Sequence, residues 1–329
     1  MQKQTVMITG GAGFIGHAII EYLLETTQFN IVSLDRLDTA GRLDRIQYII
    51  SKNPKWRNRV KVVWHDLKAP LSKYVVDKIG TVNYILHLAA GSHVDRSIQY
   101  PLEFVMDNVV GTCNLLDYAR SYCDKLKLFL YFSTDEVFGP APDGVVFKED
   151  SRYNASNPYA ATKAGAEELC NAFRNTYSLP IIITHTMNVY GPRQHPEKFI
   201  PIVIKKLLNN QEITIHSNEQ GTKSTKRRYL YSKDVAAAVK FLMFNHTVGE
   251  KYNICADRET ENLDLAKQIA ELMEKDLKYV LSYPSSIRPG NDFRYAVCGD
   301  KIHDMGWHQT VSLSEGLRKT IEWYTNNEY

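Results

Sequence analysis

Two groups of side chains in this sequence combine residue types that acid–base chemistry uses. Thr134, Asp135 and Glu136 follow one another directly after an apolar run. Tyr159 and Lys163 are four positions apart, which places them on one face of a helix. Two neighbouring carboxyl groups push their pKa values apart, so one can act as a base and the other as an acid. A tyrosine acts as a base near neutral pH when a cation such as Lys163 lowers its pKa.

These residues need a scaffold, and the sequence alternates short apolar runs with longer amphipathic segments. Such a rhythm is typical of parallel strands joined by helices. The strands are predicted at residues 5–9, 31–34, 60–63, 84–88, 128–132 and 181–184. Because the carboxyl ends of parallel strands line the ligand crevice, Asp135 and Glu136 are expected to face it. The alternative is a structural role as helix N-cap and first-turn acid.

A glycine-rich turn, GGAGFIG at residues 10–16, stands between the first predicted strand and a predicted helix. This context is what a dinucleotide-binding motif requires. The glycines permit close backbone approach, and the helix N-terminus attracts a pyrophosphate. The cofactor contacts predicted here are Gly10, Gly13, Phe14, Ile15 and Gly16.

An acidic residue, Asp35, closes the second predicted strand about 20 residues after the glycines. A carboxylate at this position can bind both ribose hydroxyls and would repel a 2′-phosphate, which favours NAD over NADP. Arg36 follows directly and could soften that preference. Asp66 and Leu67, at the end of the third predicted strand, are expected to contact the adenine, although Asp66 could also be a plain turn acid.

The composition is that of an ordinary globular protein. The 329 residues are 44% hydrophobic and 23% charged, and a net charge of +3 is too small to indicate a nucleic-acid or membrane partner. The five cysteines include no C-x-x-C pair, so they predict neither zinc nor a redox couple and are expected to be thiols in a reducing compartment. No apolar stretch approaches the roughly 18 residues of a membrane span. We expect a cytoplasmic protein without a metal.

The sequence resembles the extended short-chain dehydrogenase/reductase superfamily along nearly its whole length. The blocks that carry the resemblance are TGGAGFIG, HLAAGSHVDRSI, DNVVGTCNLL, STDEVFG, NPYAATKAGAE, NVYGPRQHPEKFIP, RRYLYSKDVAAAV and RPGNDFRY. Within that superfamily the chain is most similar to the nucleoside-diphosphate-glucose 4,6-dehydratases, which act on dTDP-glucose or UDP-glucose in pathways to rhamnose and other deoxysugars. The Thr-Asp-Glu triplet is the part that points to dehydration.

The resemblance implies a role for each residue of the first two groups. Tyr159 would take the proton of the C4 hydroxyl while C4 gives hydride to NAD. Glu136 would remove the C5 proton, and protonated Asp135 would donate to the departing C6 hydroxyl before the hydride returns to C6. Thr134 would hydrogen-bond the C4 oxygen and Tyr159, while Lys163 would support Tyr159 and bind the cofactor.

The resemblance also implies substrate contacts and an oligomeric state. A homodimer is expected to form through the two helices near residues 102–121 and 159–177. Gly91 stands where many bacterial members carry a glutamate, so the choice between dTDP and UDP stays open. A basic stretch around Arg227 would bind the diphosphate, with nuclear localisation or RNA binding as alternatives. The substrate-binding residues expected are Ser92, Asn188, Arg227, Arg288 and Tyr295.

The regular alternation weakens beyond Tyr190. The predicted fold class is therefore α/β, a Rossmann-type doubly wound parallel sheet with a smaller C-terminal α/β domain. We expect an NAD-binding domain at residues 1–186 and a sugar-nucleotide-binding domain at residues 187–329, with residues 229–256 a candidate for packing back on the first.

Two other functions compete with dehydration. A 4-epimerase or decarboxylase acting on UDP-sugars is disfavoured by Asp135 and Glu136, because epimerisation needs no acid for a C6 hydroxyl. A non-catalytic NAD-binding regulator or RNA-associated protein is disfavoured by Tyr159 and Lys163, which such a protein would not need.

Overall fold

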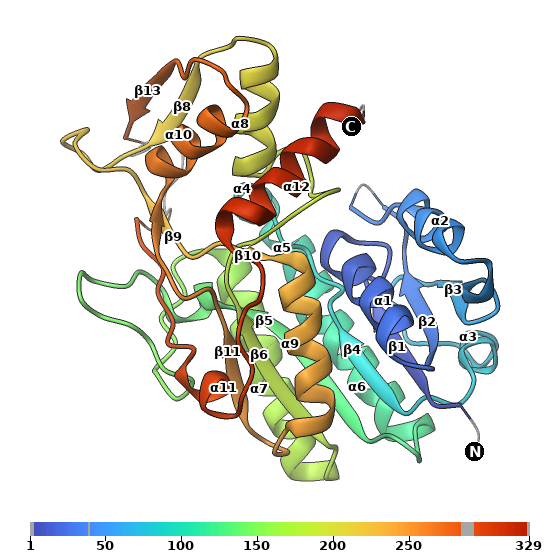
Figure 1. Cartoon of the computed structure of the whole chain (residues 1–329). Helices are drawn as coiled ribbons and strands as arrows, with labels where there is room; N and C mark the ends of the chain where they lie inside the picture. Colours follow the sequence, from blue (N-terminus) through green and yellow to red (C-terminus); the bar gives the residue numbers. More distant parts are fainter. Residues whose placement is uncertain (1–2, 39, 284–292, 328–329) are drawn as a thin grey trace.

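The computed structural model describes residues 3–38, 40–283 and 293–327. Its centre is a seven-stranded sheet in which every neighbouring pair of strands is parallel (Figure 1). The spatial order is β3-β2-β1-β4-β5-β6-β11, so the direction of winding reverses between β1 and β4. The predicted fold class is confirmed. The strands of this sheet are β1 (Thr5–Thr9), β2 (Asn30–Asp35), β3 (Val60–Trp64), β4 (Tyr84–His87), β5 (Leu128–Thr134), β6 (Ile181–Thr186) and β11 (Lys251–Ile254).

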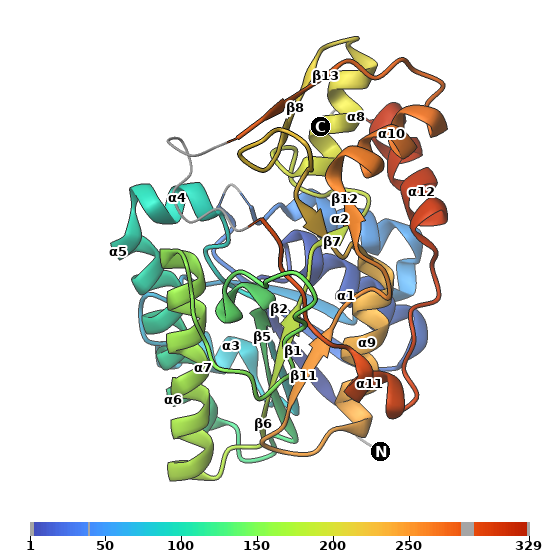
Figure 2. The same cartoon turned by 90° about the vertical axis from the view of Figure 1, so that its left-hand side faces the viewer.

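Helices cover both faces of the sheet (Figure 2). Side chains alternate along each strand, so β1 sends Val6 and Ile8 into one core and Met7 into the other. One core also takes residues from α1 (Phe14–Thr26), α2 (Leu43–Lys52) and α9 (Ser232–Asn245). The other takes residues from α3 (Lys73–Ile79), α6 (Gly111–Tyr122) and α7 (Pro158–Tyr177). Burial on both faces explains why the strands are continuous apolar runs.

Four short segments connect these layers. They are α4 (Val94–Gln99), α5 (Pro101–Phe104), the π-helical segment η2 (Val105–Val110), which continues into α6, and the 3₁₀ turn η1 (Pro54–Trp56). A second 3₁₀ turn, η3 (Asp135–Phe138), begins directly where β5 ends. No helix in the described ranges has the length and apolarity to cross a membrane.

A smaller region lies beyond the carboxyl ends of the sheet and has its own core, which includes Ile204, Leu265 and Leu317 (Figure 1). The chain crosses into it more than once: α9 packs on the large sheet and β11 pairs with β6, although both follow elements of the smaller region. The elements of the smaller region and its connections are β7 (Val189–Tyr190), α8 (Phe199–Leu208), β8 (Ile213–His216), β9 (Lys226–Arg227), β10 (Leu230–Tyr231), β12 (Thr260–Glu261), α10 (Asn262–Leu272), β13 (Tyr279–Ser282) and α12 (Leu313–Asn326). Helix α11 (Asp300–Asp304) packs beside β11, and its Ile302 belongs to the core of the large sheet.

Candidate active site

A cavity of about 680 Å³ lies at the carboxyl ends of the parallel strands, and segments of the smaller region form its far wall. Arg288, a predicted substrate contact, falls outside the described residues. Arg227 and Tyr295 are not among the residues that line the cavity. The predicted site residues that do line it are Gly10, Gly13, Phe14, Ile15, Gly16, Asp35, Asp66, Leu67, Ser92, Thr134, Asp135, Glu136, Tyr159, Lys163 and Asn188.

The glycine turn between β1 and α1 forms one wall. Gly10 has a left-handed backbone with φ of +67°. A Cβ at Gly16 would lie 2.2 Å from the carbonyl oxygen of Gly10, so no side chain fits at position 16. Helix α1 begins after Gly13 with no side-chain cap and no acidic residue in its first turn. Its free N–H groups and positive dipole end therefore suit the pyrophosphate of a dinucleotide.

Asp35 stands at the end of β2, beside the glycine turn. Its carboxylate accepts hydrogen bonds from the backbone N–H groups of Ala12, at 3.0 Å, and Leu37, at 2.8 Å. Burial raises its pKa, although these two hydrogen bonds oppose the effect. The carboxylate is thus held rigidly on the cavity wall, where the ribose of a dinucleotide bound to the glycine turn would lie.

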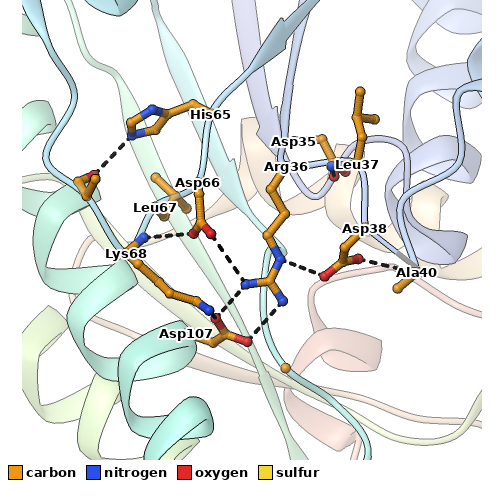
Figure 3. Close-up of polar contacts among 12 residues, drawn as sticks. Asp35, Arg36, Leu37, Asp38, Ala40, His65, Asp66, Leu67, Lys68 and Asp107 are labelled. Atoms are coloured by element: carbon orange, nitrogen blue, oxygen red, sulfur yellow. Dashed lines mark hydrogen bonds and ion pairs between the residues drawn. The ribbon is translucent and has the colours of Figure 1, made fainter.

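Charged residues surround this end of the cavity, which we call the adenosine end (Figure 3). Arg36 makes two parallel hydrogen bonds to Asp107, of 2.6 and 3.0 Å, and its Nε donates to Asp38 at 2.6 Å. Asp66 Oδ2 lies 3.9 Å from Arg36 Nη1. Lys68 Nζ lies 3.4 Å from Asp107. The sequence analysis missed Asp107, which is 71 positions from Arg36 and belongs to no local pattern with it.

The opposite end, which we call the reacting end, is formed where β5 runs into η3. Thr134 caps this turn: its Oγ1 accepts a hydrogen bond from the Glu136 N–H at 3.3 Å. It also donates to Asp135 Oδ1 at 3.1 Å. The tight turn brings both neighbouring carboxyl groups to the cavity. The cap is therefore the threonine, and neither acid serves as the N-cap.

The two carboxyl groups have different partners. Glu136 Oε2 accepts hydrogen bonds from Asn157 Nδ2, at 3.1 Å, and from the Tyr295 hydroxyl, at 3.2 Å. Asp135 Oδ2 is buried and finds no hydrogen-bond partner in the described part of the chain. Burial, together with the charge of Glu136, raises the pKa of Asp135 to about 7, while burial alone raises that of Glu136. Asp135 is thus poised to hold a proton and Glu136 is the better-solvated base.

Tyr159 and Lys163 come from the first turns of α7, whose N-cap Asn157 accepts a hydrogen bond from Ala160 N–H. Lys163 Nζ donates to the carbonyl oxygen of Phe132 at 2.8 Å, and burial lowers the pKa of Lys163 to about 8. Burial and the nearby carboxylates raise the pKa of Tyr159, against a hydrogen bond with Thr134 that lowers it. The pKa of Tyr159 is therefore not lowered, contrary to the sequence prediction, because burial outweighs the opposing contributions.

A buried hydrogen-bond network lies behind the reacting end. Ser133 Oγ donates to Glu167 Oε1 at 2.5 Å, and Tyr153 also donates to this fully buried carboxylate. His185 Nε2 lies 3.2 Å from Glu167 and Lys251 Nζ lies 3.6 Å from it. Ser133 also lines the cavity, but its hydroxyl donates to Glu167, so Thr134 is the hydroxyl at the end of β5 that we expect to meet a substrate. The position of Glu167, four residues after Lys163, was the signal in the sequence that could have revealed it.

The basic stretch makes contacts within the protein. Arg227 Nη1 donates to the carbonyl oxygens of Lys226 and Phe293, and its guanidinium lies 4.6 Å from the centre of the Tyr295 ring. Arg228 donates to the carbonyl oxygen of Ala256 at 3.1 Å. These contacts hold the stretch against the protein body, which disfavours a nucleic-acid surface. They place Arg227 beside the residue that hydrogen-bonds Glu136, one step behind the cavity wall.

Comparison with known proteins places this geometry in a family. The family model described as GDP-mannose 4,6 dehydratase matches residues 7–320. The chain belongs to this family. Within it, the chain is 37% identical to a dTDP-glucose 4,6-dehydratase of Salmonella typhimurium, over 98% of this chain and 93% of the relative. The family predicted from the sequence motifs is thereby confirmed.

Solved structures of a dehydratase and of an epimerase superpose on nearly the whole chain. A dTDP-glucose 4,6-dehydratase from Streptomyces venezuelae, crystallised with NAD and TYD bound, is 31% identical, covers 98% of both chains and gives a TM-score of 0.87. A UDP-glucose 4-epimerase from Thermus thermophilus, in complex with NAD, is 27% identical over 98% of this chain and 99% of its own, with a TM-score of 0.86. Dehydratases and epimerases thus share this fold, so the side chains at the reacting end must distinguish them.

Proposed function

We propose that this protein is an NAD-dependent sugar-nucleotide 4,6-dehydratase that converts dTDP-glucose to dTDP-4-keto-6-deoxyglucose. The observation that carries the proposal is the pair of carboxyl groups at η3, buried Asp135 and partly buried Glu136, which have different partners and line the cavity with Tyr159. The names of the relatives, which are dTDP-glucose 4,6-dehydratases, support this substrate. UDP-glucose is the alternative substrate, since the chain has Gly91 where many bacterial members carry a glutamate.

The residues at the glycine turn and the adenosine end fit a dinucleotide. The α1 N-terminus would hold the pyrophosphate, Asp35 the ribose hydroxyls, and Asp66 with Leu67 the adenine. When bound, NAD supplies a hydride acceptor for C4 of the sugar and a hydride donor for C6. The protein supplies the proton transfers.

We assign the proton transfers to Tyr159, Glu136 and Asp135, and a supporting hydrogen bond to Thr134. Tyr159, ionised once the positive charges of Lys163 and bound NAD offset the burial that raises its pKa, would take the proton of the C4 hydroxyl as C4 is oxidised, and Thr134 would donate a hydrogen bond to the C4 oxygen. The C4 ketone acidifies the neighbouring C5–H, and Glu136 removes that proton. Asp135 gives its proton to the C6 hydroxyl, which leaves as water. Glu136 then returns its proton to C5 when C6 is reduced, so the sugar loses one water and the dinucleotide ends unchanged.

The proposed substrate-binding residues come from segments that are far apart in the sequence. Ser92 and Asn188 line the cavity and are proposed to contact the sugar nucleotide directly. Arg227 and Tyr295 act from behind Glu136; the guanidinium also lowers the pKa values of both carboxyl groups, against the dominant effect of burial. For Arg227 to reach a diphosphate, its side chain would have to leave the Tyr295 ring.

The experiment that tests the function is incubation of the purified protein with dTDP-glucose and with UDP-glucose in separate tubes, with NAD added. The product is followed by mass spectrometry and NMR. We expect loss of one water and a 4-keto-6-deoxy spectrum, faster with dTDP-glucose. A product of unchanged mass would contradict the dehydratase assignment and favour a 4-epimerase.

We also propose a homodimer formed by the outer faces of α5, η2, α6 and α7, which lie side by side at one edge of the molecule (Figure 2). Large apolar side chains are exposed there: Leu102 is 71% exposed, and Tyr100, Val105, Met106, Tyr122 and Tyr177 are also exposed. Covering such a patch is favourable at about 25 cal/mol per Å². The free cysteines fit a reducing cytoplasm, where we place the protein.

Leu102→Asp tests this dimer, because a charge at the centre of an apolar interface is costly to bury. We expect the mass from light scattering to fall from that of two chains to that of one. Tyr74→Asp, at a 67% exposed residue on α3, is the matched control and should stay dimeric. A wild-type protein that is monomeric at micromolar concentration would remove the proposal.

A further inference from the structure

The charged network at the adenosine end has a consequence for cofactor choice. We propose that Asp107, assisted by Asp38, makes the protein select NAD over NADP by holding Arg36 away from a 2′-phosphate. The inference rests on the proposed use of a dinucleotide. It gives Asp107, which is far from the glycine motif in the sequence, a role in cofactor specificity. Figure 3 shows the three side chains with Asp66 and Lys68.

Arg36 has the position and chemistry of a 2′-phosphate ligand. It follows directly on Asp35, the acid placed for the ribose hydroxyls, and its guanidinium fork matches a phosphate in geometry and charge. An arginine near this position accommodates the 2′-phosphate in NADP-binding Rossmann folds. Taken from the local sequence alone, the Asp-Arg pair is therefore ambiguous.

The structure removes the ambiguity because the guanidinium is already engaged by two carboxylates. Both Nη atoms donate to Asp107, at 2.6 and 3.0 Å, and Nε donates to Asp38 at 2.6 Å. The Asp107 side chain is only 10% exposed, whereas that of Asp38 is 39% exposed. The bond to Asp107 is bidentate and better shielded from water, so Asp107 is the stronger restraint.

Neighbouring contacts fix both partners. The indole N–H of Trp64 donates to the Arg36 carbonyl oxygen at 2.9 Å, which anchors the backbone of the arginine. Asn108, next to Asp107 in η2, bonds the backbone of Gly91 through both its Oδ1 and its Nδ2, and also bonds Thr162. The π-helical segment is thus locked against the strand ends, and Asp107 cannot move away with a departing guanidinium at low cost.

The net charge at this end also opposes NADP. Four carboxylates, those of Asp35, Asp38, Asp66 and Asp107, face three cations, Arg36, Arg45 and Lys68, along one stretch of the cavity wall, so one negative charge is left in excess. A 2′-phosphate would bring about two more negative charges to this surface. It would have to compete with Asp107 for Arg36 and approach Asp35 at the same time, and both requirements disfavour it.

The test is a competition measured on the full chain. Purified protein is equilibrated with equal concentrations of NAD and NADP and separated from free ligand, and the bound dinucleotides are quantified by mass spectrometry. The variant Asp38→Asn/Asp107→Asn keeps the side-chain shapes and removes both negative charges. We expect its bound NADP-to-NAD ratio to rise at least about tenfold, because charge-assisted hydrogen bonds from Arg36 become available to the phosphate.

Two further variants separate the causes. Adding Arg36→Met to the double variant should abolish the gain if the released guanidinium binds the phosphate. Asp117→Asn breaks an exposed ion pair with Arg120 on α6 and is the control, with no expected change in the ratio. Asp107→Asn alone should give most of the gain, and it replaces the double variant if that one does not fold.

Each possible outcome of the competition tests a different claim. An unchanged ratio in the Asp107→Asn and double variants, with normal NAD binding, overturns the inference and leaves the proposed function intact. A gain that persists after Arg36→Met overturns the part assigned to Arg36. A wild-type chain that binds neither dinucleotide contradicts the proposed function itself.

Discussion

The two ends of the cavity contain the same residue type in opposite surroundings. At the adenosine end, Asp38 and Asp107 are ion-paired with Arg36. At the reacting end, Asp135 is buried and Glu136 is partly buried, and the hydrogen-bond partners of Glu136 are an amide and a phenol. The pKa of Asp38 is lowered, because hydrogen bonds and Arg36 overcome its burial, whereas that of Asp135 is raised to about 7.

This difference explains how one cavity can both bind and react. Carboxylates that stay ionised define the charge of a binding surface and select among ligands. Carboxyl groups whose burial outweighs the effect of nearby cations hold a proton closer to neutral pH and can pass it on. The surroundings of the side chain, set by elements far apart in the sequence, decide between the two roles.

The largest effect is expected at the reacting end. Asp135→Asn and Glu136→Gln should each lower the rate of water loss by about 10²–10⁴-fold, because each removes one proton transfer. Oxidation at C4 should persist, seen as a reduced-cofactor absorbance that forms when dTDP-glucose is added. Asp143→Asn, at an exposed loop position, is the control for loss of an acid without loss of function. Normal turnover in the Asp135→Asn/Glu136→Gln protein would contradict the assignment of Asp135 as the acid and Glu136 as the base.

The reacting end should also respond to pH in a way that the adenosine end does not. A general acid works in its protonated form, and Asp135 is protonated below its pKa of about 7. The elimination step should therefore slow by about tenfold per pH unit above about pH 7, when it is followed in single-turnover experiments. NAD affinity should change little over the same range, since Asp38, whose pKa is lowered, keeps its charge there. A rate that stays flat to pH 9 would show that Asp135 is not the acid.

A smaller effect is expected from Asp35→Asn. The substitution removes the charge that binds the ribose hydroxyls, so NAD should dissociate about tenfold more readily. Turnover at saturating NAD should remain near that of the wild type, because the proton-transfer groups are untouched. Titration calorimetry measures the affinity, and Asp44→Asn, on the exposed side of α2, is the control. A loss of turnover at saturating NAD with unchanged NAD affinity would contradict the assignment of Asp35 to cofactor binding alone.

Local sequence patterns predicted the sheet and the side chains at each strand end. The glycine turn, Asp35, the Thr134-to-Glu136 triplet and the Tyr159/Lys163 pair are all local signals, each tied to one strand or helix start. The structure brings these to a single cavity because parallel strands end at the same edge. Strand β11 (Lys251–Ile254) lies in residues 229–256, the candidate segment for packing back on the first domain, but no local pattern predicted that it would pair with β6.

Contacts between distant segments escaped the sequence reasoning. Arg36 and Asp107 are 71 positions apart, and Glu136 and Tyr295 are 159 apart, so no periodicity connects them. The pKa of Tyr159 was predicted in the wrong direction, because a helical spacing to Lys163 says nothing about how deeply the hydroxyl is buried. Electrostatic environment depends on the full set of neighbours, and only the folded chain supplies that set.

One labelling experiment tests the central claim most directly. The protein is incubated with dTDP-glucose that carries deuterium at C4, and the position of the label in the product is read by NMR. If C4 is oxidised and the same hydride returns to C6 after Asp135 and Glu136 have removed water, the deuterium will appear in the C6 methyl group of a product that has lost one water. Deuterium that remains at C4 in a product of unchanged mass would contradict the account.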